Sequence, residues 1–247
     1  ANLLLKDKVA NLILIGDPVV IRQMAEEKGY EYILKGENLT IIDPLTDPKM
    51  PEYANLLFEL RKAKGMTEEL ATNLLKDSVW LGTMMHKMVE VDGLVSGAVH
   101  STADTVRPAI QIIKTAKGVK SISSVFFMCL PSETLVYGDC AITPNPDAET
   151  LATIAAQSND TAKAFGLPAR VAMLSYSTGK SGKGDDVDLV LAALEILKKE
   201  RPDILVDGPL QYDAASTESV AEKKMPGSPV AGKASVFVFP DLNSGNI

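Results

Sequence analysis

One short stretch of the chain places hydroxyl groups and a guanidinium where a strand-like run passes into a helix. The apolar run covers residues 94–99, and the polar residues that follow it are Ser101, Thr102, Thr105 and Arg107. A hydroxyl of Thr102 or Thr105 can cap the first turn of a helix. Pro108 fits inside that first turn, where its missing N–H is not needed. Free helix amides, hydroxyls and Arg107 together predict a site for a phosphate or a carboxylate.

The alternative for this stretch is an ordinary helix cap, because serine and threonine are common at such junctions. Ser96 and Gly97 interrupt the apolar run and are candidates to line the same site.

His100 next to Ser101 suggests a nucleophile and its base. Neighbouring residues on a strand point to opposite faces, so direct pairing of the two is not expected. Ser101 also lacks the glycines of a G-x-S-x-G elbow.

The elements around this stretch alternate between strands and helices. We expect strands over 12–16, 40–43, 94–99, 122–130, 135–142, 169–176, 204–207 and 234–239. We expect helices over 18–28, 51–64, 67–76, 78–91, 105–116, 147–165, 185–200 and 213–223. This alternation of strands and helices predicts an α/β protein with a three-layer αβα architecture and a largely parallel sheet.

Composition excludes several classes of function. Hydrophobic residues make up 46% of the 247 residues and charged residues 23%, as in ordinary globular proteins. The net charge of −7 argues against general binding to nucleic acid or anionic membranes, which need a basic surface. No apolar run is long enough to span a bilayer. Cys129 and Cys140 fit no zinc spacing, so we expect buried, reduced thiols, no metal and a cytoplasmic protein.

Two further polar groups follow predicted strands. Asp207, Gln211 and Asp213 either line a ligand site or turn the chain and cap the next helix. Residues 175–184 contain Gly179-Lys180-Ser181, which is half of a phosphate-binding P-loop. The full motif needs a glycine five positions before Gly179, where this chain has Leu174, so a flexible loop is the favoured interpretation.

Several longer motifs, in this order, resemble those of phosphotransacetylases. They lie at residues 53–62, 82–85, 91–93, 95–108, 138–141, 144–149, 207–215 and 239–247. The resemblance implies an enzyme that reversibly transfers acetyl between coenzyme A (CoA) and phosphate. It also implies two α/β domains with the active site in the cleft between them, as in isocitrate and isopropylmalate dehydrogenases. The domains would be 1–118, without a returning C-terminal part, and 119–247.

The same resemblance assigns roles to residues. Arg107, Ser101 and Thr102 would act at the phosphate and acetyl end as catalytic residues. Arg61 and Arg107 would bind CoA, although Arg61 is equally consistent with a solvated residue on the exposed face of its helix. Ser96, Gly97, Asp207, Gln211 and Asp213 would line the cleft. The substrates would be acetyl-CoA, phosphate and acetyl phosphate, with no permanently bound cofactor, in a cytoplasmic homodimer of acetate metabolism.

One departure from the family affects the expected activity. The family's catalytic serine–arginine pair and the aspartate proposed to activate the thiol follow the motif that ends here at Ile247. We therefore expect the 247-residue chain alone to be inactive. Two alternatives remain open: a noncatalytic acetyl-CoA-sensing domain of the kind fused to malic enzymes, and a phosphate butyryltransferase.

Overall fold

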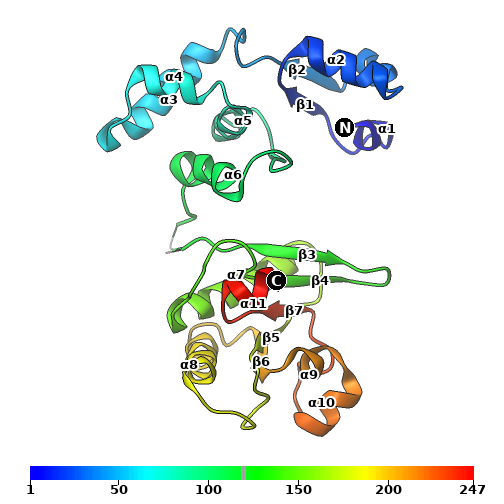
Figure 1. The fold of residues 1–247 in the computed structure, drawn as a ribbon, viewed down its shortest axis with the longest axis vertical. Coiled ribbons are helices and arrows are strands. Elements are labelled where there is room, and N and C mark those ends of the chain that lie inside the picture. Colours follow the sequence, from blue (N-terminus) through cyan, green and yellow to red (C-terminus); the bar gives the residue numbers. More distant parts are fainter. Residues whose placement is uncertain (118, 120) are drawn as a thin grey trace. The chain divides into compact units, whose positions relative to one another are not determined.

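The computed structural model describes residues 1–117, 119 and 121–247, which divide into two units, Ala1–Ala116 and Lys117–Ile247 (Figure 1). Each unit has its own hydrophobic core and is described by itself. The predicted domain boundary at residue 118 lies outside the described residues.

The first unit joins a small parallel sheet to a group of helices. Its first part contains α1 (Asn2–Lys6), β1 (Leu12–Ile15), α2 (Pro18–Glu27), the 3-10 helix η1 (Glu31–Lys35) and β2 (Leu39–Ile42). Its second part contains α3 (Met50–Arg61), η2 (Lys62–Lys64), α4 (Glu68–Leu74), α5 (Ser78–Lys87), α6 (Thr102–Pro108) and the π-helix η3 (Ala109–Ile113). Strands β1 and β2 pair in parallel, so both end at the same edge.

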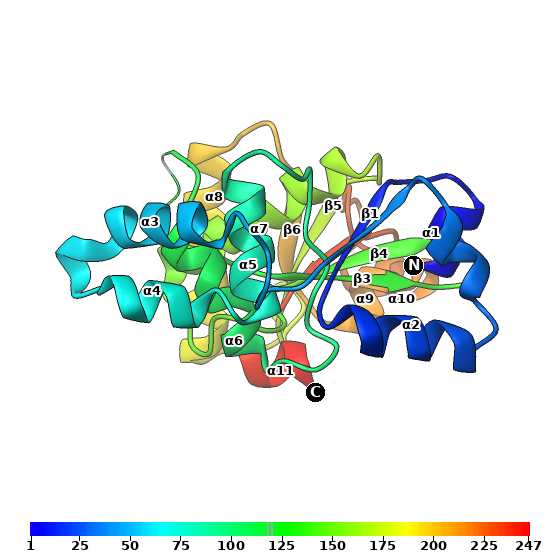
Figure 2. The ribbon, with the colours of Figure 1, turned by 90° about the horizontal axis from the view of Figure 1, so that it is seen from above.

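Helix α5 forms the centre of the core of the first unit. Every residue from Val79 to Met85 is buried, as expected for a helix that is apolar on all sides. Tyr53 and Leu57 of α3 are fully buried in the same cluster, and so is Ile112 of η3. Helices α3 and α4 lie side by side (Figure 2). Packing on all sides fixes α5 within this core, so the residues at the two ends of α5 have defined positions.

The predicted strand over residues 94–99 is wrong. These residues form no strand, and Val95 and Val99 are 100% and 90% exposed. A strand exists only through its pairing, and no strand in the described part of the chain pairs with this segment. Gly97 also has a φ of +104°, which interrupts extended backbone.

The predicted helix over residues 105–116 starts earlier than expected and changes type. Ser101, rather than Thr102 or Thr105, is the N-cap of α6. Pro108 is therefore the last residue of α6 and not part of its first turn. Its missing N–H and its ring oppose regular α-helical bonding, and the wider π-helix η3 follows directly.

The second unit is built on a five-stranded sheet in the order β3-β4-β7-β5-β6. Its elements are β3 (Val125–Cys129), β4 (Thr134–Gly138), α7 (Ala148–Ala164), β5 (Arg170–Leu174), α8 (Asp185–Glu200), β6 (Leu205–Leu210), α9 (Tyr212–Ser216), α10 (Glu218–Lys224), β7 (Val236–Val238) and α11 (Leu242–Asn246). Strands β3 and β4 form an antiparallel hairpin, and the other pairs are parallel.

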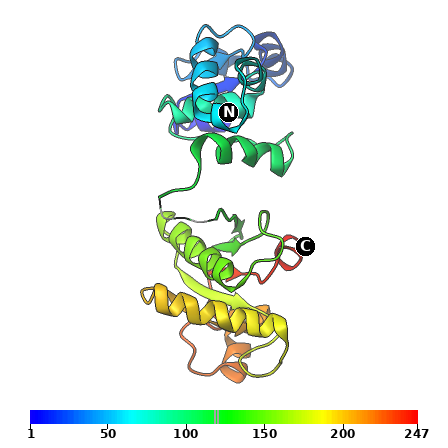
Figure 3. The same cartoon turned by 90° about the vertical axis from the view of Figure 1, so that its left-hand side faces the viewer.

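Helices cover both faces of this sheet. One core cluster joins α7 and α8 to the sheet through residues such as Ile154, Leu194 and Val236. The other joins α9 and α10 to the opposite face through Ala215, Ala221 and Phe237. Figure 1 shows α8 and the α9–α10 pair on opposite sides of β5 and β6, and Figure 3 shows α7 and α8 side by side.

These observations confirm the predicted α/β class and correct several details. Strand β6 continues to Leu210, beyond the expected end at Asp207. The helix expected over 213–223 is two helices that meet at Thr217. Cys140 is buried as predicted, but Cys129 is exposed because it lies on the edge strand β3. No helix in the described part of the chain is long and apolar enough to cross a membrane.

Candidate functional site

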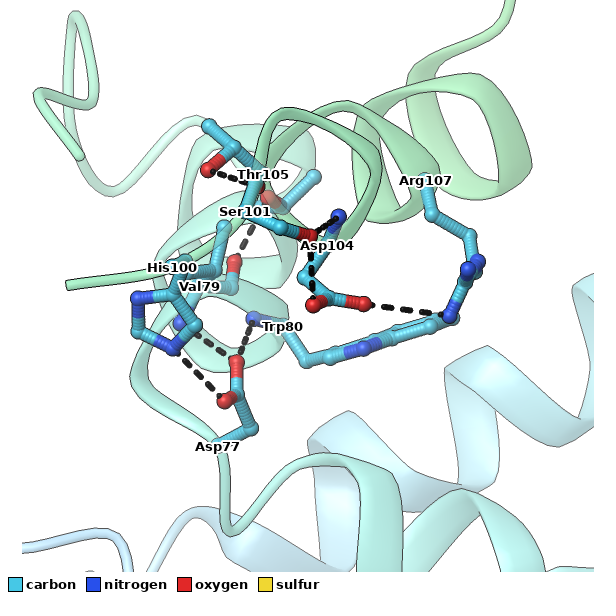
Figure 4. Close-up of polar contacts among 9 residues, drawn as sticks. Asp77, Val79, Trp80, His100, Ser101, Asp104, Thr105 and Arg107 are labelled. Atoms are coloured by element: carbon cyan, nitrogen blue, oxygen red, sulfur yellow. Dashed lines mark hydrogen bonds and ion pairs between the residues drawn. The ribbon is translucent and has the colours of Figure 1, made fainter. Parts of the chain in front are cut away.

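The start of α6 is held by a hydrogen-bond network centred on Ser101 (Figure 4). Its Oγ accepts from the backbone N–H of Asp104 at 3.2 Å and donates to Asp104 Oδ2 at 2.7 Å. The Thr105 hydroxyl donates to the backbone carbonyl of Ser101 at 3.0 Å. The helix start therefore fixes the direction of the Ser101 hydroxyl.

The side chain of Arg107 belongs to the same network. It turns back along α6, and its Nη1 lies 3.3 Å from Asp104 Oδ1 (Figure 4). Ser101 and Arg107 thus contact the two oxygens of one carboxylate. Both charged side chains are more than half exposed, so this pair stabilises the helix only weakly. The hydroxyl of Ser101 and the guanidinium of Arg107 thus face one carboxylate from two sides.

The network corrects the expected geometry around Arg107. Arg107 lies in the last turn of α6 and not beside its first amides. Thr102 is the first residue of the helix, and Thr105 bonds back to Ser101 instead of capping. The residue that joins Ser101 to Arg107 is Asp104, which was not among the predicted site residues. Its signal was present, because serine followed three positions later by an acidic residue is a capping pattern.

Two of the candidate lining residues lie in the exposed segment before α6. Ser96 and Gly97 are both exposed. A Cβ on Gly97 would lie 3.7 Å from the hydroxyl of Thr105, so this glycine runs beside the first turn of α6.

His100 contacts a residue that is distant in the sequence and does not contact the hydroxyl of Ser101. Its Nε2 lies 3.0 Å from Oδ2 of Asp77 (Figure 4). Asp77 is the N-cap of α5, and its Oδ1 accepts from the backbone N–H groups of Val79 and Trp80 at 2.9 and 3.2 Å. One carboxylate therefore joins the starts of two helices.

Arg61 lies in the last turn of α3 and is half-buried. Its Nε is buried and has no hydrogen-bond partner among the described residues. A buried N–H without an acceptor is costly, since it has lost its water without gaining a partner. The Nε of Arg61 is therefore enclosed by the protein, although the residue as a whole is half-buried.

A pocket of about 480 Å³ lies at the carboxyl ends of β1 and β2 in the first unit. Its lining includes Asp43, Asp47, Lys49 and Glu90 above apolar residues of the two strands. Three carboxylates against one ammonium group disfavour a polyanion there. The predicted anion site is therefore not expected in this pocket.

Tyr53 and Glu90 form a coupled pair at the edge of that pocket. Burial raises the pKa of Tyr53 well above its ordinary value, and the hydrogen bond to Glu90 at 2.8 Å adds to the rise. Burial opposes ionisation of Glu90, but the bonds from Tyr53 and from Lys49 at 3.0 Å outweigh it and lower its pKa. Both residues line the pocket and are hydrogen-bonded to each other. This pair was not predicted from the sequence.

The polar group of the second unit is internally satisfied. Asp207 lies inside β6 and accepts from Ser228 Oγ at 2.5 Å. Gln211 Oε1 accepts from Lys224 Nζ at 3.1 Å, and the same ammonium group lies 3.0 Å from Asp213. The bond from Lys224 lowers the pKa of Asp213. The structure brings Gln211 and Asp213 together at this edge of the sheet, whereas Asp207 bonds to a different loop.

The loop at residues 175–184 also bonds to itself. Ser177 Oγ accepts from Gly182 N at 2.8 Å, and Ser181 Oγ accepts from Thr178 N at 3.0 Å. The Tyr176 hydroxyl donates to the carbonyl of Lys183 at 3.0 Å. A phosphate-binding loop offers its backbone N–H groups to the ligand. In this loop the N–H groups of Ser177, Thr178, Ser181 and Gly182 are instead bonded within the loop itself.

Asp139, in the turn after β4, is the most completely bonded carboxylate described here. It is 3% exposed and accepts from the backbone N–H groups of Ala141, Ile142 and Thr143 at 3.0, 3.1 and 3.0 Å. Ser124 Oγ also donates to it. Burial opposes ionisation, but these bonds outweigh it and lower the pKa of Asp139. Burial, reinforced by the charge of Asp139, raises the pKa of the neighbouring Cys140 thiol to about 11.

No group of three or more histidine, cysteine, aspartate or glutamate side chains in the described residues is arranged to hold a metal ion.

Comparison with known proteins assigns the family. The model of the family described as phosphate acetyl/butaryl transferase matches residues 1–247. The chain is 58% identical over 238 residues to a phosphate acetyltransferase of Haemophilus influenzae, and 55% identical over 238 residues to one of Escherichia coli. Each match covers 96% of this chain and 33% of the relative, so the chain spans about a third of the length of these curated relatives.

Solved structures agree with this assignment. The EutD phosphotransacetylase from Staphylococcus aureus is 43% identical with a TM-score of 0.81, over 95% of this chain and 71% of that one. A phosphotransacetylase from Streptococcus pyogenes is 44% identical with a TM-score of 0.81, over 94% of this chain and 70% of that one.

Proposed function

The chain belongs to the phosphate acetyl/butaryl transferase family, and from this premise we propose that the protein carrying it is a phosphate acetyltransferase. Its reaction is the reversible conversion of acetyl-CoA and phosphate into acetyl phosphate and CoA. The observation that carries the proposal is 58% identity, over 96% of this chain, to a phosphate acetyltransferase. The α6 network supports it, because donors that hold a carboxylate from two sides also suit a phosphate.

The reaction requires an acyl transfer between two polyanions. In the direction that forms acetyl-CoA, the thiol of CoA loses its proton and its sulfur attacks the acetyl carbonyl carbon. A carbon–sulfur bond forms, the bond between that carbon and the phosphate oxygen breaks, and phosphate leaves with the bonding electrons. The protein must hold both reactants together and stabilise the charge on the carbonyl oxygen and the leaving phosphate.

We assign the phosphate and acetyl end to α6. The planar guanidinium of Arg107 donates hydrogen bonds to phosphate oxygens. Ser101 donates its hydroxyl to the same anion, and Thr102 presents its exposed hydroxyl from the next position. In the described structure Asp104 takes the place of that anion, so binding of phosphate requires the carboxylate of Asp104 to release Arg107 and the Ser101 hydroxyl.

We assign the CoA end to Arg61 together with Arg107. The buried Nε of Arg61 without a partner supports this role, since a phosphate oxygen of CoA would supply the missing acceptor. Ser96 and Gly97 beside α6 are proposed to line the substrate site of the first unit, and Asp207, Gln211 and Asp213 are proposed as ligand-lining residues of the second unit. The two domains are proposed to be 1–118 and 119–247. We further propose that the enzyme acts as a cytoplasmic homodimer.

The test is an assay of CoA-dependent release of phosphate from acetyl phosphate. We expect turnover by the full-length protein and none by the 247-residue chain alone. Acetyl-CoA and butyryl-CoA are compared as substrates in the reverse direction. Preference for butyryl-CoA would identify a phosphate butyryltransferase, and binding of acetyl-CoA without any turnover by the full-length protein would identify a sensing domain.

A further inference from the structure

The contact between His100 and Asp77 joins two parts of the first unit that differ in rigidity. Asp77 starts α5, the buried helix at the centre of the core. His100 ends the exposed segment that leads to α6. A carboxylate can only accept a hydrogen bond, so Nε2 of His100 carries the proton in this 3.0 Å contact.

The exposed segment is attached to α5 at both of its ends. At the first end, Leu94 packs closely against Gly82 of α5, because a Cβ on Gly82 would lie 2.7 Å from Leu94 Cδ1. At the second end, His100 bonds to Asp77 (Figure 4). Residues 95–99 between these attachments are exposed, and Gly97 has a positive φ. The bond of His100 therefore fixes the second end directly at the N-cap of α6, while the rest of α6 is held by its packing against α5.

We propose that His100, held by Asp77, is a positioning residue for the anion-binding end of α6. Ser101 follows His100 directly, and adjacent Cα atoms are about 3.8 Å apart. A shift of His100 therefore moves the N-cap, and with it the Ser101 hydroxyl and the Asp104 carboxylate that orients Arg107. This inference rests on the proposed function and adds a residue that sets the geometry of its phosphate end.

The exposure of the His100 and Asp77 side chains indicates whether loss of their contact should affect stability or kinetics. The His100 and Asp77 side chains are 22% and 39% exposed, so the contact adds little to the stability of the fold. Catalytic groups are far more sensitive to position, since misplacement by about 1 Å can cost about a hundredfold in rate. Removal of the contact should therefore change kinetics much more than melting temperature.

The experiment uses four variants of the full-length protein. His100→Phe removes the donor, and His100→Gln keeps an N–H donor near the position of Nε2. Asp77→Ser keeps a capping oxygen for α5 but removes the oxygen that His100 contacts. Asp147→Ser is the matched control, because Asp147 caps α7 of the second unit and bonds there to Thr150 N.

The measured quantities are kcat and the KM for phosphate in the formation of acetyl phosphate. We expect His100→Phe and Asp77→Ser to raise the KM for phosphate about tenfold or more. His100→Gln should stay within about threefold of the wild type, and Asp147→Ser should leave the KM unchanged. In a protein that already carries Arg107→Ala, His100→Phe should have a smaller further effect on the KM, because only the Ser101 hydroxyl is left for it to position.

Hydrogen exchange of the backbone separates this inference from the proposed function. The peptide over residues 100–108 should exchange faster in His100→Phe and Asp77→Ser than in the wild type and in Asp147→Ser. An inactive wild type would contradict the proposed function, while the exchange measurement would still test the positioning. Unchanged exchange in both variants, or an unchanged KM in an active enzyme, would overturn the inference. Additive effects of His100→Phe and Arg107→Ala would also overturn it.

Discussion

Asp104 in the first unit and Asp139 in the second show two ways to hold a carboxylate. Asp104 is exposed and contacts Ser101 and Arg107, each three residues away on the same helix. Asp139 is buried and accepts from three backbone N–H groups of its own turn and from Ser124, fifteen residues earlier. Both networks satisfy their carboxylate, but only the first uses donors that an incoming anion can reach.

The difference is between an exposed network, which we propose as the binding site, and a buried structural one. The proposed phosphate would replace Asp104, whose contact with Arg107 is exposed and therefore weak. Replacing Asp139 would require the whole turn after β4 to open. Burial combined with complete hydrogen bonding therefore indicates a large contribution to stability, and an exposed network contributes little.

The largest expected effect is on activity, at Arg107. Arg107→Ala should raise the activation free energy by about 2–4 kcal/mol if the guanidinium stabilises charge in the transition state. The melting temperature should change little, because the side chain is 56% exposed. The measurement is kcat/KM of the full-length protein with acetyl phosphate and CoA. Arg22→Ala, at an exposed position of α2, is the control, and normal kinetics in Arg107→Ala would remove Arg107 from the mechanism.

The next effect is on stability, at Asp139. Asp139→Asn replaces an accepting oxygen by an amide that faces other donors, so we expect a loss of about 1–3 kcal/mol in the free energy of unfolding. Urea denaturation at neutral pH measures it. Asp147→Asn is the control, because asparagine caps a helix as well as aspartate does. Equal losses in the two variants would contradict the distinction drawn between buried and exposed carboxylates.

The pH dependence of the same variant sharpens the test. The pKa of Asp139 is lower in the folded protein than its ordinary value. Its contribution to stability is therefore present above the ordinary carboxyl pKa and disappears as the pH falls through the folded-state value. The difference in unfolding free energy between wild type and Asp139→Asn should shrink below about pH 4. A difference that grows on acidification would contradict the assigned ionisation.

Local patterns in the sequence predicted much of this fold. An uninterrupted apolar run predicted β1, and Asp17 and Pro18 marked the start of α2 where the structure places it. The expected and observed bounds of α8 coincide at residues 185 and 200. These elements depend on periodicity and on capping within a few residues, and the sequence displays both directly.

The errors occurred where distant contacts decide the structure. Residues 94–99 have the composition of a strand, but a strand also needs a partner. The bond between His100 and Asp77 spans 23 residues, and no periodicity links the two positions. Ser101 and Arg107, which the sequence analysis placed in one candidate site, contact the same carboxylate, but the linking role of Asp104 required coordinates.

A smaller effect is expected at the N-cap itself. Ser101→Ala removes the acceptor for the N–H of Asp104 and should cost about 1 kcal/mol of stability in the first unit. Urea unfolding followed by the fluorescence of Trp80, the single tryptophan of these 247 residues, measures it. Ser101→Thr keeps the hydroxyl and should restore the stability. A loss in Ser101→Thr equal to that in Ser101→Ala would show that the cap is not what the hydroxyl contributes.

The smallest effect tests what decides how much a carboxylate contributes to stability. The alternatives are its exposure and the unit in which it lies. Arg201 in the second unit bonds to Asp160 at 2.9 Å and to Asp203 at 2.8 Å, and both carboxylates are 53% exposed. Its bond lowers the pKa of Asp203 to about 2, so the stabilisation is present above the ordinary carboxyl pKa and disappears as the pH falls toward that value.

Arg201→Gln should therefore lower the melting temperature at neutral pH by roughly a degree or two, and less in 1 M salt (about 3 Å of screening length) than in dilute buffer. Calorimetry at the two salt concentrations provides the measurement, with Asp139→Asn as the buried reference whose effect salt should leave nearly unchanged. A loss at Arg201 as large as that at Asp139, and insensitive to salt, would mean that burial does not distinguish the two kinds of carboxylate network.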